Sequence, residues 1–159
     1  MVRQATQMDF DFIYNLYMHP QVNPFILYEW MDAKSFEPVY DDLLQQSVKY
    51  IYHNVEQSVG MFKLIPLKYR TAHIAYLGGL AIHPAYAGQG EGKKMLAEIL
   101  ASAGARGFLR IELSVAYINT KAIQLYEKSG FKKEGVLRKY SHLKSEGRFI
   151  DELMMAFLF

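Results

Sequence analysis

The sequence predicts an α+β domain built on a mixed β-sheet, and three observations support that class. Apolar residues alternate in some segments and recur at helical spacing in others, in the order β-α-α-β-β-β-α-β-α-β-β. The longest strand, Thr71–Ile82, is nearly continuous in apolar residues, which is typical of a strand buried on both faces. A helix joins it to the strand Leu109–Val115, and such a crossover favours a parallel pair within an otherwise antiparallel sheet.

The N-terminal half is expected to contain a short strand, two helices and a hairpin. Thr6 and Asp9 have the spacing of a capping box, so a helix should start there, and Pro20 should end it. The expected elements are a strand at Val2–Ala5, a helix at Phe10–Tyr17, a helix at Ala33–Gln46 and strands at Lys49–Asn54 and Ser58–Ile65. The aromatic stretch Gln21–Trp30 is a loop, which either packs on the core or forms the wall of a substrate pocket.

The C-terminal half is expected to supply the rest of the sheet and two more helices. The pair Gly78-Gly79 inside the long strand indicates a bulge or a close approach of the backbone. The later elements are a helix at Gly90–Arg106 stopped by Gly107, a helix at Asn119–Lys128, and strands at Lys132–Leu143 and Phe149–Phe159 joined by a turn at Ser145–Gly147.

Composition narrows the class of protein. The 159 residues suit one domain, residues 1–159, and 51% of them are hydrophobic. The absence of cysteine excludes a disulfide framework, a thiol nucleophile and thiolate metal sites. A net charge of +2 gives no argument for nucleic-acid binding. There is no run of about 18 apolar residues, and the N-terminus lacks the apolar core of a signal peptide, so we expect a cytoplasmic protein without a membrane partner.

The stretch Leu80–Leu96 carries the clearest chemical signal. Three glycines at every second position, Gly88–Gly92, follow an apolar strand and precede a helix. Glycine lets backbone N–H groups approach a ligand, and the start of a helix adds unpaired N–H groups, so the stretch predicts an anion cradle, most often for phosphate. A P-loop is excluded because Lys94 stands where Ser or Thr should follow Lys93. The glycine spacing also excludes a dinucleotide fingerprint.

A third interpretation comes by resemblance. Ala87–Gly92 resembles motif A of the GNAT superfamily of acetyl-CoA-dependent N-acetyltransferases, Arg/Gln-x-x-Gly-x-Gly/Ala. Asn119–Phe131 resembles the family's Asn-x-x-Ala-x-x-Leu-Tyr-x-Lys-x-Gly-Phe. The resemblance covers the whole chain and is strongest to the bacterial branch of small-amine, amino-acid and phosphinothricin acetyltransferases. It implies a GNAT-like acyl-CoA N-acyltransferase fold, with a mixed central sheet of about six to seven strands flanked by about four helices.

The resemblance also implies acetyl-CoA as cosubstrate and no metal. Backbone N–H groups of the glycine loop would hold the pyrophosphate, and the end of the central strand would pair with the pantetheine chain and contact the thioester oxygen. The residues expected to bind the cofactor are Leu80, Ala81, Ile82, Gly88, Gln89, Gly90, Glu91, Gly92, Lys93, Asn119, Tyr126 and Lys128. Two departures predict weakened affinity: Ala87 stands at the Arg/Gln position, and Glu91 would repel a pyrophosphate unless it points away.

Tyr126 is the residue for which the resemblance implies a catalytic role. It lies seven residues after Asn119, about two helical turns, so the two side chains share one face of their helix. A phenol can donate a proton to the leaving thiolate. The general base stays open, because the family's usual strand glutamate is missing. The candidates are His73, Tyr76, His83 and Glu112, or a water held by one of them.

The acceptor is the least determined part of this hypothesis. The leading expectation is direct attack by a primary amine, either a small amine or an amino acid, in a ternary complex. Glu29 and Asp32, near the aromatic loop, are candidates to bind its cationic group. One alternative is a protein N-terminus or lysine as acceptor, and another is an acyl-CoA-binding module without catalysis. A homodimer through an apolar edge at Leu153–Phe159 is a further expectation.

Overall fold

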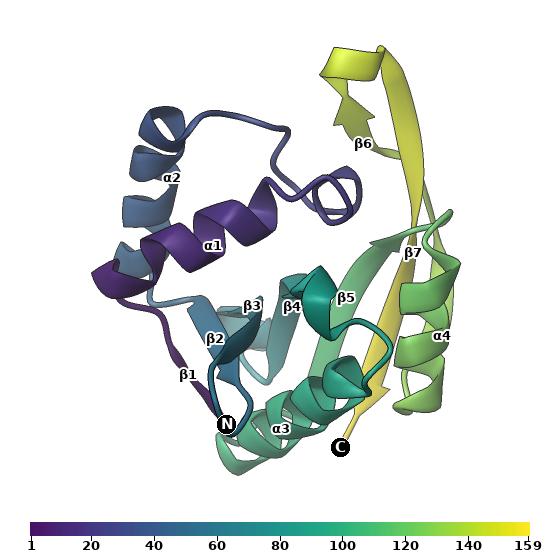
Figure 1. The fold of residues 1–159 in the computed structure, drawn as a ribbon. Coiled ribbons are helices and arrows are strands. Elements are labelled where there is room, and N and C mark those ends of the chain that lie inside the picture. The colour runs from purple at the N-terminus through teal and green to yellow at the C-terminus, as the bar shows by residue number, and fades with distance from the viewer.

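Seven strands form one mixed sheet, and two pairs of helices cover its faces (Figure 1). The computed structural model describes all 159 residues, and the strand order is β1-β2-β3-β4-β5-β7-β6. The elements are β1 (Val2–Gln4), α1 (Phe10–Tyr17), α2 (Ala33–Gln45), β2 (Lys49–His53), β3 (Ser58–Pro66), β4 (Ile74–Ile82), α3 (Glu91–Ala105), β5 (Arg110–Ala116), α4 (Thr120–Lys128), β6 (Lys132–Leu143) and β7 (Arg148–Leu158). The predicted α+β class and the predicted element order are confirmed.

Strands β4 and β5 form the only parallel pair, as the helical crossover between them predicted. Their pairing joins Ile74–Tyr76 to Arg110–Glu112 and goes no further. β4 continues to Ile82 and β5 to Ala116 without another ladder contact between them. The two strands therefore diverge, and a gap opens in the sheet toward their C-terminal ends.

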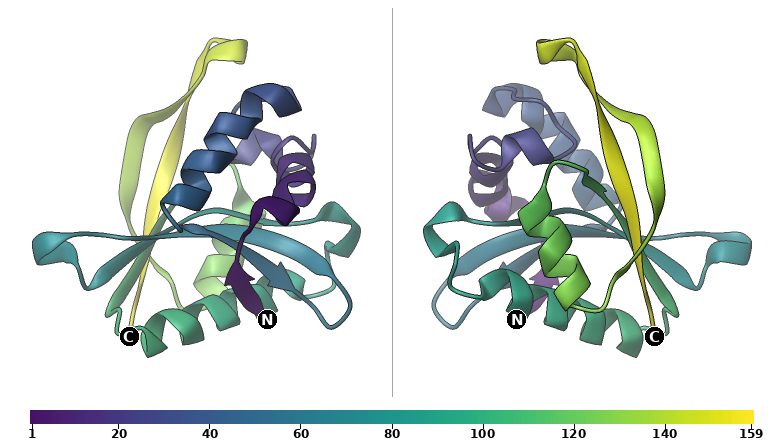
Figure 2. Two further views of the ribbon diagram at one scale, coloured as in Figure 1. Left: turned by 90° about the vertical axis from the view of Figure 1, so that its left-hand side faces the viewer. Right: turned by 90° about the vertical axis from the view of Figure 1, so that its right-hand side faces the viewer.

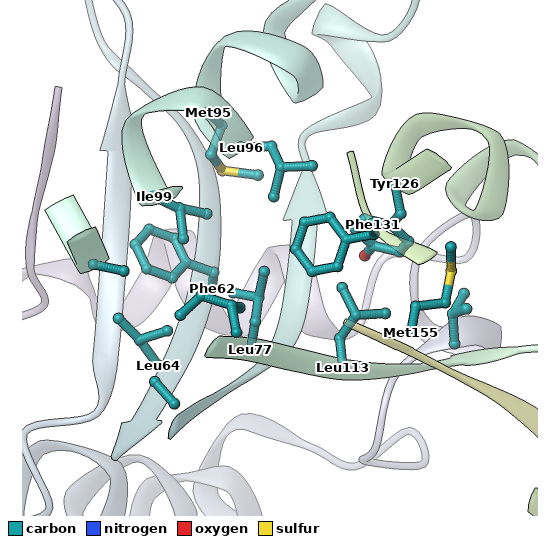
Figure 3. Close-up of a cluster of buried hydrophobic side chains, with 14 of the residues drawn as sticks. Phe62, Leu64, Leu77, Met95, Leu96, Ile99, Leu113, Tyr126, Phe131 and Met155 are labelled. Atoms are coloured by element: carbon teal, nitrogen blue, oxygen red, sulfur yellow. The ribbon is translucent and has the colours of Figure 1, made fainter. Parts of the chain in front are cut away.

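The two faces of the sheet carry separate hydrophobic clusters. Helices α1 and α2 lie on one face and α3 and α4 on the other (Figure 2). Beneath α1 and α2, a cluster of 10 buried residues includes Phe36 and Tyr40. On the other face, 19 buried residues pack together, among them Leu96 and Leu113, which Figure 3 shows between α3 and the sheet. Burial of a side chain of this size stabilises the fold by about 1.5–3 kcal/mol, so both rims of the gap are firmly held.

The predicted bulge in the central strand is confirmed. Met61 of β3 pairs with Ala81, whereas Lys63 pairs with Gly78, so two residues of β4 oppose the single residue Phe62. Gly79 takes a positive φ of 54°, a conformation that glycine adopts without strain. The expected start of this strand at residue 71 is wrong, because residues 69–71 form a 3₁₀ turn and β4 begins three residues later.

The C-terminal strand occupies an interior position in the sheet. β7 pairs with β5 on one side and with β6 on the other. The expectation of a homodimer through an apolar edge at Leu153–Phe159 is therefore wrong in its structural premise, because the backbone of this segment already pairs with β5 as far as Leu158 and with β6 as far as Ala156. The edges of the sheet are β1 and β6. None of the helices has the length and apolar character needed to cross a membrane.

Candidate active site

A cleft of about 1460 Å³ follows the gap between β4 and β5. One side, which we call the cofactor half, is lined by the end of β4, the glycine loop and the start of α4. The other side, the acceptor half, is lined by residues of the α1–α2 loop, Lys63 of β3 and the β6–β7 hairpin. A cleft of this kind, between strands that separate at their C-terminal ends, is a favourable place for a ligand.

The glycine loop presents a row of unpaired backbone donors to the cofactor half. The N–H groups of Gly88 and Gly90–Lys93 have no backbone acceptor, and the first bond of α3 runs from the Lys94 N–H to the Gly90 carbonyl. Gly88 and Gly90 have φ values of 77° and 78°, which turn successive N–H groups toward one side. The positive end of the α3 dipole adds to this arrangement. The predicted anion cradle is therefore present as a row of unpaired backbone N–H donors.

Glu91 does not point into this cradle. One of its carboxylate oxygens accepts a hydrogen bond from the Tyr52 hydroxyl at 2.9 Å, and the other accepts one from the Lys94 ammonium at 2.8 Å. The side chain is buried, and these two donors hold the pKa of the Glu91 carboxyl below its usual value. These two hydrogen bonds therefore fix the position of the carboxylate at the N-terminus of α3. Its pairing with Lys94 removes the reason to expect repulsion of a bound pyrophosphate.

The end of β4 supplies an open backbone edge. Beyond Tyr76 no ladder bond joins β4 to β5, so the groups of Leu80, Ala81 and Ile82 that face the gap are unpaired on that side. All three residues line the cleft. Ala81 and Ile82 pair with β3 on their opposite side, whereas Leu80 lies in the bulge. An extended ligand could add to this edge as a further strand would.

Tyr126 and Asn119 meet the cleft from α4, across the gap from β4. The Tyr126 ring is buried, burial raises the pKa of its hydroxyl above the usual value, and that hydroxyl makes no hydrogen bond within the protein. Close by in the cleft, the Tyr76 and Ser114 hydroxyls share a hydrogen bond of 2.8 Å. The Asn119 side chain caps α4 by accepting from the Ala122 N–H at 3.3 Å. Its amide N–H groups remain available to a ligand.

Several residues singled out in the sequence lie elsewhere or have other partners. Gln89 is exposed and donates to the Ala85 carbonyl, and Lys128, also exposed, sits in the last turn of α4; neither lines the cleft. Of the four candidate bases, only Tyr76 lines it. His73 is exposed before β4, His83 accepts from the Ala85 N–H, and Glu112 pairs with Arg110.

The two carboxylates that were expected to bind the acceptor, Glu29 and Asp32, make hydrogen bonds within the protein. Glu29 accepts hydrogen bonds from the backbone N–H and the hydroxyl of Ser145, which ties the α1–α2 loop to the β6–β7 turn. Asp32 caps α2 by accepting from the Ser35 N–H at 2.7 Å. The aromatic loop lines the cleft from Gln21 to Leu27 and also packs on the core, because Val22 is buried in the smaller cluster and Ile26 lies against it. Both interpretations therefore hold for the geometry of the loop, and contact with a substrate stays a prediction.

Sequence reasoning missed two charged residues of the acceptor half. Glu152 of β7 lines the cleft and accepts a hydrogen bond from the Ser141 hydroxyl of β6 at 2.9 Å. Lys63 lines the cleft from β3, although only 7% of its surface is exposed. A signal existed for the lysine, because it interrupts the apolar run from Val59 to Ile65. Nothing local marked Glu152.

The family comparison agrees with this geometry. A family model described as acetyltransferase (GNAT) family matches residues 10–131. The chain belongs to the GNAT family of acetyltransferases. The match spans both predicted motifs, the glycine loop of this GNAT domain and the segment that runs from Asn119 to Phe131.

Solved structures share the fold over its whole length. A spermidine N-acetyltransferase from Vibrio cholerae, in complex with CoA and spermine, has a TM-score of 0.84 at 23% identity, covering 99% of this chain and 94% of that one. A ribosomal-protein-alanine N-acetyltransferase from Brucella melitensis has a TM-score of 0.81 at 20% identity, covering 100% and 99%. A putative acetyltransferase from Salmonella typhimurium with its cofactor acetyl-CoA has a TM-score of 0.78 at 18% identity, covering 99% and 92%. No curated protein matches this GNAT chain in sequence.

Proposed function

We propose that this protein is an N-acetyltransferase that moves an acetyl group from acetyl-CoA to a primary amine, either a small amine or an amino acid. The amine attacks the thioester directly while both substrates are bound. The observation that carries this proposal is the unpaired row of N–H groups at Gly88 and Gly90–Lys93, which opens onto the same cleft as the unpaired edge of β4 and the Tyr126 hydroxyl.

The cofactor half fits acetyl-CoA in its polar parts. The N–H row matches the pyrophosphate, because several preorganised donors and a helix dipole stabilise a dianion, and the nearby Glu91 carboxylate is already paired with Lys94. The edge formed by Leu80, Ala81 and Ile82 matches the amide groups of pantetheine. Lys93 lines the cleft and can add a cation, while Lys94 is already paired with Glu91.

The chemistry requires one proton to leave the amine and one to reach the thiolate. Acetyl-CoA supplies an activated acyl carbon when bound. Tyr126 keeps its proton at neutral pH because burial raises its pKa, and its hydroxyl has no competing partner in the protein. It is therefore suited to give that proton to the leaving sulfur. The unpaired backbone edge at Leu80, Ala81 and Ile82 would supply the N–H donor that stabilises charge on the thioester oxygen.

The proton on the amine has two acceptor routes in the cleft. Burial raises the pKa of Tyr76, so its phenol serves best by orienting a water through the shared bond with Ser114. Glu152 is the carboxylate of the acceptor half that lies within the sheet, and it can take a proton through such a water. His73, His83 and Glu112 do not line the cleft, so we assign this step to neither histidine nor to Glu112.

Turnover with a panel of amines tests the proposed function. The protein is incubated with acetyl-CoA and, separately, amino acids, alkylamines, polyamines or peptides, and free CoA is followed with a thiol reagent. Release of CoA together with a mass gain on a small amine is the expected result. If only proteins were acetylated, as detected by intact mass, the acceptor would be a protein rather than a small amine. CoA binding with no transfer to any acceptor would contradict catalysis and leave an acyl-CoA-binding module.

A further inference from the structure

Two buried lysines face each other at the base of the acceptor half. Lys49 of β2 and Lys63 of β3 are direct cross-strand partners, and their exposed fractions are 1% and 7%. No carboxylate forms an ion pair with either. Like charges opposite each other on adjacent strands are destabilising, and buried charges are normally paired. Packing alone therefore gives no reason for this pair.

The two lysines differ in their surroundings. The Lys49 ammonium donates to the Tyr17 hydroxyl at 2.9 Å and does not line the cleft. Lys63 has no hydrogen-bond partner, and its Nζ is not sealed from the cleft that it lines. Its Nζ lies 5.3 Å from the centre of the Tyr28 ring, which is its only electrostatic contact with the α1–α2 loop.

The bulge in β4 places Lys63 beside the reaction site. Its Cε lies 3.7 Å and 3.5 Å from the points where Cβ atoms of Gly78 and Gly79 would stand. Because both positions are glycine, no side chain separates the lysine from the strand edge along which the thioester is proposed to lie. A cation that is buried, unpartnered and open to this space is a binding group that lacks its anion.

We propose that Lys63 binds a carboxylate of the acceptor, so that the acceptor of this enzyme is a free amino acid rather than a simple amine or a polyamine. The inference rests on the proposed function and names its substrate class. A bound carboxylate offsets the desolvation of the ammonium and supplies the missing hydrogen-bond partner. A polyamine would instead bring a second cation toward Lys63 and leave the ammonium without an anion.

The titration behaviour of the cluster is consistent with this assignment. Burial lowers the pKa of Lys63, and the titratable groups packed around it are Lys49, Tyr17 and Tyr28, none of which is an acid at neutral pH. A bound carboxylate would favour the protonated lysine and raise this pKa. Binding of an amino acid should therefore take up protons from the buffer.

Matched acceptors provide the kinetic test. kcat/KM is measured for leucine, leucinamide and 3-methylbutylamine, and for glycine, methionine and phenylalanine with their amides. The acids are expected to be preferred over the amides by about tenfold, the value of one charge-assisted hydrogen bond. In Lys63→Met the preference should disappear, whereas Lys63→Arg should retain part of it and Lys68→Met, at an exposed position, should retain all of it. An equal loss for acids and amides in Lys63→Met would overturn the assignment.

A binding measurement separates this inference from the proposed function. N-acetyl amino acids and their amides carry no free amine, so their affinity in the presence of CoA can be measured by calorimetry without turnover. Tighter binding of the acids in the wild type, lost in Lys63→Met, supports the carboxylate site even if no amine is acetylated. Turnover without any preference for acids would refute the site and leave the acetyltransferase intact. Melting curves verify that Lys63→Met is folded, and its Tm should not fall, because an unpaired buried charge has been removed.

Discussion

The two halves of the cleft are built by different means. In the cofactor half, the proposed binding groups are backbone N–H and C=O groups, exposed because glycines turn the chain at Gly88 and Gly90 and because β4 and β5 diverge. In the acceptor half, the proposed binding groups are side chains, among them Lys63 and Glu152, and the lining comes from three separate segments. Backbone sites depend on local conformation and are encoded by short motifs, whereas side-chain sites depend on which strands become neighbours.

This difference predicts that the two halves of the cleft can change independently. The cofactor half is tied to the sheet by ladder bonds and to α3 and α4 by the larger hydrophobic cluster. The acceptor half is closed by the contact between Glu29 and Ser145, which joins two surface segments. A substitution among the side chains of the second half changes what is bound without disturbing the first. The following predictions test this separation, from the largest effect to the smallest.

Tyr126→Phe should lower kcat about 100-fold, because it removes the proposed proton donor to the thiolate. KM for acetyl-CoA should change little, since the ring still packs in the core and the backbone donors remain. Steady-state kinetics with acetyl-CoA and the best acceptor give both constants. Tyr50→Phe is the control, because its hydroxyl contacts Arg106 outside the cleft. An unchanged kcat in Tyr126→Phe would remove this residue from the mechanism.

Gly90→Val should raise KM for acetyl-CoA about tenfold while leaving KM for the acceptor unchanged. A β-branched residue at a φ of 78° costs about 1–2 kcal/mol and shifts the N–H row out of place. Gly107→Val is a matched control, because Gly107 has a φ of 84°, open space around it and no place in the cleft. Both variants should lose similar stability in urea denaturation. A raised cofactor KM in both would mean that destabilisation, and not the lost donors, is responsible.

The contrast between local motifs and long-range pairing also explains how much of the structure the sequence could predict. The glycine spacing, the Asn119–Phe131 motif and the apolar run of β4 are local signals, and they predicted the parallel pair, the bulge and the cofactor half. The place of β7 between β5 and β6 depends on long-range pairing, so its edge position was predicted wrongly. Glu91 was suspected of repulsion because its partner Tyr52, 39 residues away, cannot be inferred from the helix that carries it.

Glu152→Gln should lower kcat/KM for the acceptor about fivefold, because it removes the carboxylate proposed to take the amine proton, whose interaction with a positively charged amine is worth about 1 kcal/mol at a partly exposed position. KM for acetyl-CoA should be unchanged, since the residue lies in the acceptor half. Glu127→Gln serves as the control, because that carboxylate is paired with Lys133 on the surface of α4. If Glu152→Gln altered the cofactor KM instead, the two halves of the cleft would not be separable.

Lys49→Met should give the smallest effect, a change in the pH dependence of stability. Burial lowers the pKa of Lys49 well below its usual value, whereas the unfolded chain titrates near pH ~10.4. Between these two pKa values the unfolded state binds more protons, so the free energy of unfolding of the wild type rises with pH. The variant lacks this contribution, so its stability relative to the wild type should fall as the pH rises toward ~10, as measured by urea denaturation. For the control Lys68→Met, the difference in free energy of unfolding from the wild type should not change with pH. If Lys49→Met also gave a constant difference, the Lys49 ammonium would stay protonated in the folded protein.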